Sequence, residues 1–271
     1  MLMYHRILKR PRSDYDTTPE AFLDEMRTLY RSGYRPITAA DLASGEVDLP
    51  AGTSPVVLTF DDSSREQLWY TKRGRISPRS AIGMLLAFSK THPGFAPVAT
   101  MYVNRSPFGF SDPSDVLGDL YERGFELGNH TADHLDLSDL APAKAEAQLR
   151  AGARVITRVV PGLEVRTVAL PYGRRPKRHS LAWRGRGYSH EGVFLVGSEP
   201  APSPYSSSFD PHGIPRIRTG AGAYGARFWL RVIGEDPARR FVSDGDPAVV
   251  SFPKRLVGLV RKGLDVTLNP Y

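Results

Sequence analysis

An apolar run that ends in two adjacent carboxylates constrains this chain more than any other feature. Residues 56–60, Val-Val-Leu-Thr-Phe, are apolar or β-branched and predict a buried strand, and Asp61 and Asp62 follow directly. Because successive strand residues point to opposite faces, at least one carboxylate must enter the surroundings of the strand end. Burying one unpaired carboxylate is costly, and burying two without a cation or hydrogen-bond donors costs more. The fold must therefore bring a neutralising group to this strand end.

Strand and helix patterns alternate along most of the chain. Strands are expected at residues 2–4, 35–38, 56–60, 98–103, 125–128, 165–170, 192–197 and 248–252. Helices are expected from Thr17 to Gly33, at 39–44, from Ser77-Pro78 to 90, at 114–123 and at 142–159. Residues 199–225, rich in Pro, Ser and Gly, are expected to form an ordered surface loop. This alternation predicts an α/β fold, and the number of strands in 271 residues favours a barrel over an open sheet.

Polar residues suited to catalysis follow several of the expected strands. They are His5, Asp61-Asp62, His130 with His134, and Pro171-Tyr172. In α/β barrels the chemistry takes place at the carboxyl ends of the strands, which is where these residues are expected.

His130 and His134 are spaced as metal ligands often are. On one turn of helix or helical loop, two imidazoles four residues apart share a face, which suits a divalent metal. The Asp61-Asp62 pair could supply a third ligand, and an Asp-His-His set with open positions is typical of catalytic sites. The bound metal would acidify a water, and the other carboxylate could accept the proton. Taken singly, the same residues could be surface histidines, a helix cap or a turn; their occurrence together favours the metal site.

Composition narrows the remaining choices. The chain has no cysteine, which excludes disulfides, thiolate zinc sites and a cysteine nucleophile. No apolar run reaches 18 residues, so no membrane span is expected. The net charge of +7 favours anionic surroundings such as nucleic acid, teichoic acid or an acidic polysaccharide. No signal peptide is visible.

Three motifs resemble those of a known family. Thr59-Phe60-Asp61-Asp62, His130-Thr131-x-x-His134 and Leu170-Pro171-Tyr172-Gly173 are similar, in this order, to the motifs of the polysaccharide deacetylases, also called carbohydrate esterase family 4 or NodB-homology domains. The resemblance extends from Leu2 to about Phe252. It implies one catalytic domain over residues 1–271, with a deformed (β/α) barrel of about seven strands.

The resemblance also implies an activity and roles for individual residues. The reaction would be hydrolysis of acetyl groups from N-acetylglucosamine-type sugars or from acetylated xylan. Asp62, His130 and His134 would bind Zn²⁺, or Co²⁺ or Ni²⁺, and Asp61 would be the general base. The backbone N–H of Tyr172 would help to hold the oxyanion.

The chain departs from the family pattern in three places. Ser63 stands where a glycine is usual, which is acceptable if its φ is not positive. Ala169 and Leu170 stand where an arginine normally orients the base, so that role is vacant or filled by Arg166, Arg174 or Arg216. The expected late strand at 249–252 lacks the histidine that many members carry.

His5 offers a replacement for that histidine. Met3-Tyr4-His5-Arg6 is similar to the start of the circularly permuted branch of the family, which includes exported poly-N-acetylglucosamine deacetylases. In that branch the acid histidine comes from the N-terminal strand, so the resemblance implies that His5 protonates the leaving amine. The alternative is that His5 is only a disordered terminal residue.

A basic stretch follows the Pro-Tyr-Gly motif, with Arg174, Arg175, Lys177 and Arg178 preceding Trp183. It is either a groove wall for an anionic or sugar polymer, with Pro171, Arg174 and a stacking Trp183 as substrate contacts, or a solvated loop. The other histidines lack ligand spacing and are expected at the surface: His92, His179, His190 and His212.

The leading hypothesis is a metal-dependent N-deacetylase that acts on a cell-wall or extracellular amino-sugar polymer. The protein is expected outside or on the surface of a bacterial cell, with a cytoplasmic location as the alternative. The hypothesis includes no nucleic-acid partner and makes no prediction of oligomeric state. The alternatives are an O-acetyl xylan esterase, a catalytically weak glycan-binding protein and a basic nucleic-acid binder, whose affinity would fall steeply with salt.

Overall fold

Among the residues that the structure describes, eight parallel strands form the central sheet. The structure, a computed structural model, describes residues 1–197, 199–219, 223–236 and 240–271. The strands are β1 (Leu2–Tyr4), β2 (Tyr34–Ile37), β3 (Ser54–Phe60), β4 (Thr100–Val103), β5 (Glu126–Asn129), β6 (Thr167–Ala169), β9 (Gly192–Phe194) and β10 (Ile217–Arg218). They pair in the order β10-β1-β3-β4-β5-β6-β9, with β2 beside the first half of β3.

The two edges of this sheet meet. Ile214 bridges to Phe194 at the end of β9, and Ile217 pairs with Leu2 of β1. The segment that contains both isoleucines therefore joins β9 to β1 and closes the sheet into a deformed barrel. The predicted α/β barrel is confirmed.

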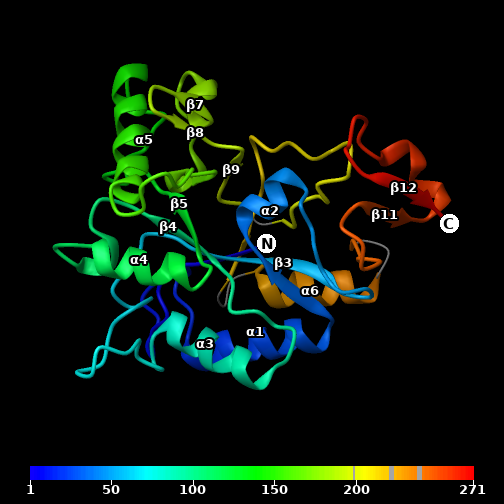
Figure 1. Cartoon of the computed structure of the whole chain (residues 1–271), viewed down its shortest axis with the longest axis horizontal. Coiled ribbons are helices and arrows are strands. Elements are labelled where there is room, and N and C mark those ends of the chain that lie inside the picture. Colours follow the sequence, from blue (N-terminus) through cyan, green and yellow to red (C-terminus); the bar gives the residue numbers. More distant parts are fainter. Residues whose placement is uncertain (198, 220–222, 237–239) are drawn as a thin grey trace.

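In the part of the chain that the structure describes, six α-helices lie outside the strands (Figure 1). They are α1 (Pro19–Arg31), α2 (Ala39–Ser44), α3 (Ala81–Thr91), α4 (Ser114–Glu122), α5 (Pro142–Thr157) and α6 (Ala226–Glu235). Two of them begin later than predicted. In each, the hydroxyl that caps the helix belongs to a residue further along the chain than the expected cap. Thr18, not Thr17, accepts the Ala21 N–H in α1, and Ser80 accepts the Gly83 N–H in α3. None of the described helices is long and apolar enough to cross a membrane.

Residues 249–252 are not part of the barrel, contrary to the prediction. They form β11 (Val249–Phe252), which pairs with β12 (Thr267–Pro270) in a separate two-stranded sheet. The barrel strand in their place is β10, which lies in the stretch predicted to be a surface loop. A strand of two residues is too short to produce an alternating pattern, so the sequence could not reveal it.

The remaining elements are short. β7 (Arg184–Gly185) and β8 (Tyr188–Ser189) form a hairpin. The 3₁₀ turns are η1 (Pro107–Gly109), η2 (Pro171–Gly173), η3 (His179–Ala182) and η5 (Lys254–Leu259).

Aromatic packing in the core fixes β1 and β3, the strands that precede His5 and the Asp61-Asp62 pair. The buried rings of Tyr4, Phe22 and Phe60 pack edge-on or stacked, with centroids 5.1 to 6.1 Å apart. They join the two strands to α1. Aromatic pairs of this kind contribute about 0.5–1.5 kcal/mol beyond their buried area.

Glu25 of α1 is a carboxyl group buried in this core, and it should make stability depend on pH. The Tyr4 hydroxyl donates to Glu25 Oε2 at 2.7 Å, yet burial dominates and raises the pKa of Glu25 from 4.5 to about 7. Because the folded pKa is the higher one, the folded state loses stability as the pH rises from about 4.5 through 7. Glu25→Gln keeps an acceptor for Tyr4, so urea unfolding should show a gain on the order of 1–3 kcal/mol at pH 8 and little difference at pH 4.5. Glu20→Gln, on the exposed side of α1, is the control. If the free energy of unfolding depended on pH in the same way in Glu25→Gln and in the parent, the prediction would be contradicted.

Candidate metal centre

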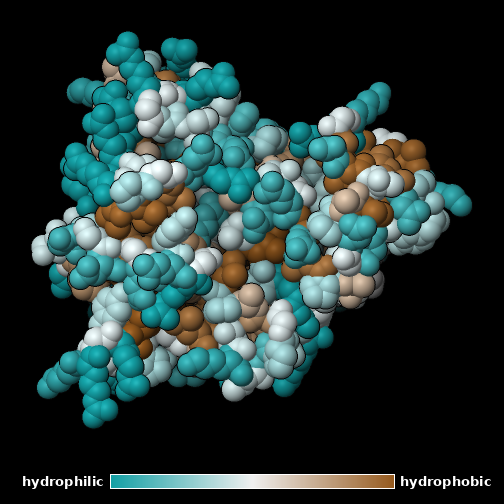
Figure 2. Space-filling view, in the orientation of Figure 1, coloured by the Kyte–Doolittle hydropathy of each residue, from teal (hydrophilic) through white to brown (hydrophobic). Residues whose placement is uncertain are grey.

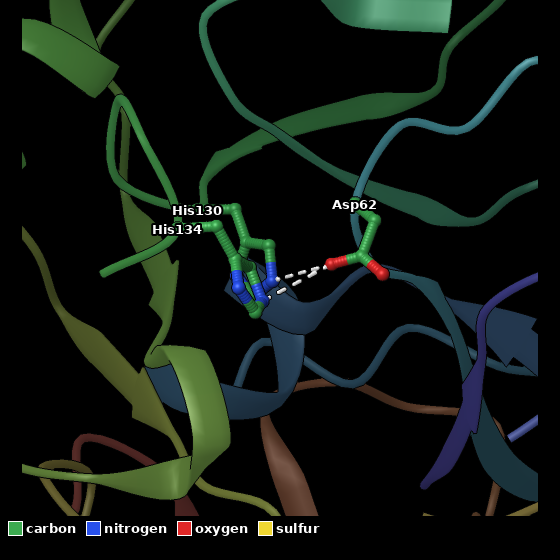
Figure 3. A group of neighbouring side chains, drawn as sticks. All are labelled: Asp62, His130 and His134. Atoms are coloured by element: carbon green, nitrogen blue, oxygen red, sulfur yellow. Dashed lines mark hydrogen bonds and ion pairs between the residues drawn. The ribbon is translucent and has the colours of Figure 1, made fainter. Parts of the chain in front are cut away.

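Three side chains converge at the carboxyl ends of β3 and β5 (Figure 3). Asp62 Oδ1 lies 3.2 Å from His130 Nε2 and 3.2 Å from His134 Nε2. Ligand atoms on a tetrahedral zinc ion at about 2.0–2.1 Å lie roughly 3.3 Å apart. The three donors therefore fit one divalent ion, and three protein ligands leave a coordination position open for water or substrate.

Protonation of the side chains supports the same fit. Burial lowers the pKa of His130, but Asp62 and Asp61 outweigh it and the net shift is upward. The His130 ring donates from Nδ1 to the Ala169 carbonyl oxygen at 2.8 Å, which turns Nε2 toward Asp62. Burial of Asp62 is likewise outweighed by its two histidine partners, which hold its pKa far below the usual range. Asp62 is therefore held ionised, which is the form in which a carboxylate binds a metal.

The backbone around this group is strained. Among the described residues, seven that are not glycine have positive φ, and five of them lie here: Asp62, Ser63, Thr131, His134 and Tyr172. Such conformations cost on the order of 1–3 kcal/mol each and cluster at functional sites. Ser63 has φ of 43°, so the expectation that a residue other than glycine needs a negative φ there is wrong. Its hydroxyl contacts Asn104 Oδ1 at 3.2 Å and its carbonyl accepts the Phe108 N–H, which hold it in place.

The spacing of His130 and His134 predicted a turn of helix or a helical loop. In the structure an irregular loop brings the two side chains together instead. Both Thr131 and His134 are left-handed, with φ of 63° and 52°. Asn129 Oδ1 accepts the Thr131 N–H at 2.9 Å and stabilises the first of these turns. The two imidazole centroids lie 4.9 Å apart.

Asp61 is neutralised by Arg216. Arg216 Nη1 and Nη2 donate to the two Asp61 oxygens at 2.7 Å each, and both side chains are fully buried. Arg216 also donates to the Leu195 carbonyl and to Thr59 Oγ1. Burial alone would raise the pKa of Asp61, but the Arg216 charge outweighs it and the net shift is downward. Asp61 is therefore held ionised and in one orientation.

Of the three arginines considered from the sequence, only Arg216 contacts Asp61. Arg166 pairs with Glu191 at 2.8 Å, and Arg174 lies 3.6 Å from Asp136. Arg216 immediately precedes β10, so its position could not be inferred while that stretch was taken for a loop.

A cavity of about 340 Å³ opens over these groups. His5, Asp61, Asp62, His130, His134 and Tyr172 all line it, together with Leu170, Val196 and the segment that contains Arg6, Ser13, Tyr15 and Asp16. The structure therefore brings six of the predicted site residues together.

His5 forms part of the cavity wall at the end of β1. Burial lowers its pKa, and the charges of Asp61 and Asp62 oppose that only in part. Its Nδ1 is buried and has no hydrogen-bond partner among the described residues, while its ring packs on Tyr15 with centroids 5.0 Å apart. His5 therefore lines the cavity with one ring nitrogen that no described residue engages.

Tyr15 belongs to a wall that was not predicted. Asp16 fixes this wall because it accepts from Arg6 Nε and Nη2 and from the backbone N–H groups of Arg12 and Ser13. In the sequence, this wall was indicated only by a tyrosine next to an aspartate in the polar loop that follows His5.

The other predicted substrate contacts lie outside the cavity lining. Trp183 stacks on His212 with centroids 4.2 Å apart, Arg174 is exposed beside Asp136, and Pro171 is buried. His190 is also buried, contrary to its expected surface location. It donates from Nδ1 to the Ala182 carbonyl at 2.7 Å, and burial lowers its pKa to about 4.

The chain is similar in sequence to one protein family. The family model for polysaccharide deacetylases matches residues 49–189. This range contains Asp61, Asp62, His130, His134 and Tyr172 but neither His5 nor Arg216. No curated protein sequence matches the chain significantly.

Three solved structures share the fold. The deacetylase PplD of Streptococcus pyogenes, in complex with acetate, has a TM-score of 0.61 and 18% identity over 85% of this chain and 95% of its own. BA0330 of Bacillus anthracis has a TM-score of 0.61 and 20% identity over 85% of this chain and 67% of its own. IcaB of Ammonifex degensii has a TM-score of 0.56 and 21% identity over 85% and 94%.

Proposed function

Because the chain belongs to the polysaccharide deacetylase family, we propose that it is a metal-dependent hydrolase that removes acetyl groups from an N-acetylglucosamine-type polysaccharide. Membership of the family supports a hydrolytic deacetylase. One observation carries the finer proposal: three ligands for a divalent ion lie beside a buried, ionised carboxylate in one cavity. Metal and base are the two groups that hydrolysis of an unactivated amide needs most.

Each residue of the cavity has a part in the proposed reaction. Asp62, His130 and His134 would hold the metal, most readily Zn²⁺, with Co²⁺ or Ni²⁺ as alternatives; when bound it would polarise the acetyl carbonyl and acidify water. Asp61 accepts the proton of the attacking water, and Arg216 keeps it ionised and oriented. The Tyr172 backbone N–H donates to the oxyanion of the tetrahedral intermediate. His5 gives a proton to the nitrogen as the C–N bond breaks, which releases acetate and a free amine.

The surroundings of Asp61 and His5 also help to choose between deacetylation, glycan binding without turnover, and hydrolysis of acetylated xylan. The glycan-binding alternative was motivated by a missing arginine, and Arg216 removes that motive because it pairs with the base. An amine is a poor leaving group until it is protonated, whereas a sugar alkoxide needs less help. His5 on the cavity wall therefore favours an amide substrate over the ester of acetylated xylan.

Amino-sugar polymers of this class lie outside the cytoplasmic membrane. We therefore propose that the protein acts at the surface of a bacterial cell or outside it. That residues 1–271 form a single catalytic domain stays a prediction.

Removal of the metal tests the proposal. The protein with Zn²⁺ should release acetate from N-acetylated chitin oligomers, and a chelator should abolish the release. His134→Ala should weaken Zn²⁺ binding in calorimetry at least about a hundredfold and abolish turnover with it. His179→Ala, an exposed histidine outside the cavity, is the matched control. Acetate release from acetylated xylan but not from chitin oligomers would favour the ester alternative instead.

His5→Ala should lower kcat on the amide substrate by roughly 10²–10⁴-fold, because the leaving amine loses its acid. Zn²⁺ affinity should not change, since His5 is not among the three ligands. An activated aryl acetate, whose leaving group needs no proton, should be hydrolysed at nearly the parent rate. An equal loss on both substrates would contradict the acid role and indicate a structural one.

A further inference from the structure

The outer face of the C-terminal segment exposes a cluster of apolar side chains. Val257 and Leu259 of η5 are 55% and 59% exposed, and Leu268 and Tyr271 are 43% and 69% exposed. Figure 2 shows hydrophobic surface gathered over this part of the molecule, at the upper right where Figure 1 places β12. Exposed apolar groups that gather in this way commonly mark an interaction surface.

The core does not need these side chains. The inner face of the same segment is covered, since Val250 and Phe252 are buried and Leu256 and Val260 pack against them. Val257 and Leu259 lie between Leu256 and Val260 in the sequence and are exposed to solvent.

Four cations flank Val257 and Leu259 in the sequence. Lys254, Arg255, Arg261 and Lys262 are exposed, and residues 253–264 contain no acidic residue. Within the described parts of the chain, none of these four side chains takes part in an ion pair. We call these four cations and the four exposed apolar residues the C-terminal patch. An apolar centre with a cationic rim matches the interface of a bilayer that contains anionic lipids.

The C-terminal patch lies at the end of the barrel opposite to the metal centre. Ser243, which leads into this segment, exchanges backbone hydrogen bonds with Gly52 and Thr53, directly before the start of β3. Tyr205, whose carbonyl accepts the Arg261 N–H, donates its hydroxyl to Gly45 at the end of α2. Asp62, in contrast, follows the carboxyl end of β3. A molecule that rests on the patch therefore keeps its catalytic cavity turned away.

We propose that the C-terminal patch docks the protein peripherally on an anionic lipid bilayer. Val257 and Leu259 enter the region between headgroups and acyl chains, and the four cations contact lipid phosphates. A second copy of the chain is a poorer partner, because an isologous contact would bring two sets of four positive charges together. The proposal does not depend on the enzymatic one, since binding to vesicles needs no substrate.

Sedimentation with vesicles tests the proposal. The full chain should bind vesicles of phosphatidylglycerol and phosphatidylcholine and leave pure phosphatidylcholine vesicles almost unbound. Lys254→Gln with Arg255→Gln should weaken binding roughly 10- to 30-fold, and Val257→Ser with Leu259→Ser at least about tenfold. The matched control is Lys72→Gln with Arg73→Gln, an adjacent exposed pair outside the patch that removes the same charge.

Several results would overturn the proposal. An equal loss in both charge pairs would mean that net charge alone drives binding. Binding that survives Val257→Ser with Leu259→Ser, and that soluble polyphosphate abolishes, would identify an anionic polymer as the partner. Failure to bind anionic vesicles would reject the site outright. Both serines replace side chains that are more than half exposed, so thermal unfolding should confirm that the variant folds.

Discussion

Replacing Asp61 by asparagine should lower acetate release by roughly 10²–10⁴-fold, the range that a general base contributes. Asparagine keeps the shape of the side chain and an acceptor for Arg216, but it cannot take the proton of the attacking water. Zn²⁺ binding should persist, because the ligand atoms belong to Asp62, His130 and His134. Initial rates on chitin oligomers and Zn²⁺ calorimetry, measured on the same sample, check both parts.

The substitution also leaves the Arg216 charge buried without its partner, so the fold must be checked separately. Urea unfolding of Asp61→Asn gives that information. Asp24→Asn, which removes an exposed carboxylate paired with Arg27 on α1, is the control and should keep the parent rate. Full activity of a folded Asp61→Asn variant would show that another group is the base.

Arg216→Met should destabilise the protein by about 3–5 kcal/mol, because it leaves the Asp61 carboxylate buried without a cation. With Arg216 gone, burial is opposed mainly by His130 and the pKa of Asp61 should rise. Activity at neutral pH should therefore also fall, because a smaller fraction of Asp61 is ionised. Urea unfolding measures the first effect, and the pH dependence of kcat/KM measures the second.

Arg166→Met is the matched control for this prediction. Arg166 also pairs with a carboxylate through two guanidinium nitrogens, yet its side chain is 30% exposed and Glu191 is 45% exposed. Exposed pairs of this kind contribute about 1 kcal/mol or less. Similar losses in the two variants would contradict the argument. Arg216→Lys, which keeps the charge but not the paired geometry, covers the case in which Arg216→Met fails to fold.

The sequence predicted the barrel because its longer strands carry clear signals. Val56 to Phe60 reads as a buried strand, and the polar residues that follow each strand mark its carboxyl end. Since parallel strands of a barrel end at one rim, His5, Asp62 and His130 could be expected near one another before any coordinates were known.

Two parts of the site could not be predicted, each for a local reason. Arg216 sits before a strand of only two residues inside a stretch rich in Pro, Ser and Gly, where no periodicity exists to read. The loop from His130 to His134 depends on left-handed residues that are not glycine, held by contacts such as the one between Asn129 and Thr131. Neither conformation follows from local propensity, because both are imposed by the surrounding fold.

The strand order has a consequence for synthesis of the protein. β1 lies between β3 and β10, so during synthesis this strand must wait for a neighbour that follows more than 200 residues later. Until Arg216 arrives, Asp61 has no buried cation, and the end of β3 cannot close around it without a large electrostatic cost. Ribosome-bound chains that end before residue 216 should therefore remain open at this rim. Barrel closure and the neutralisation of Asp61 therefore coincide in one late folding event.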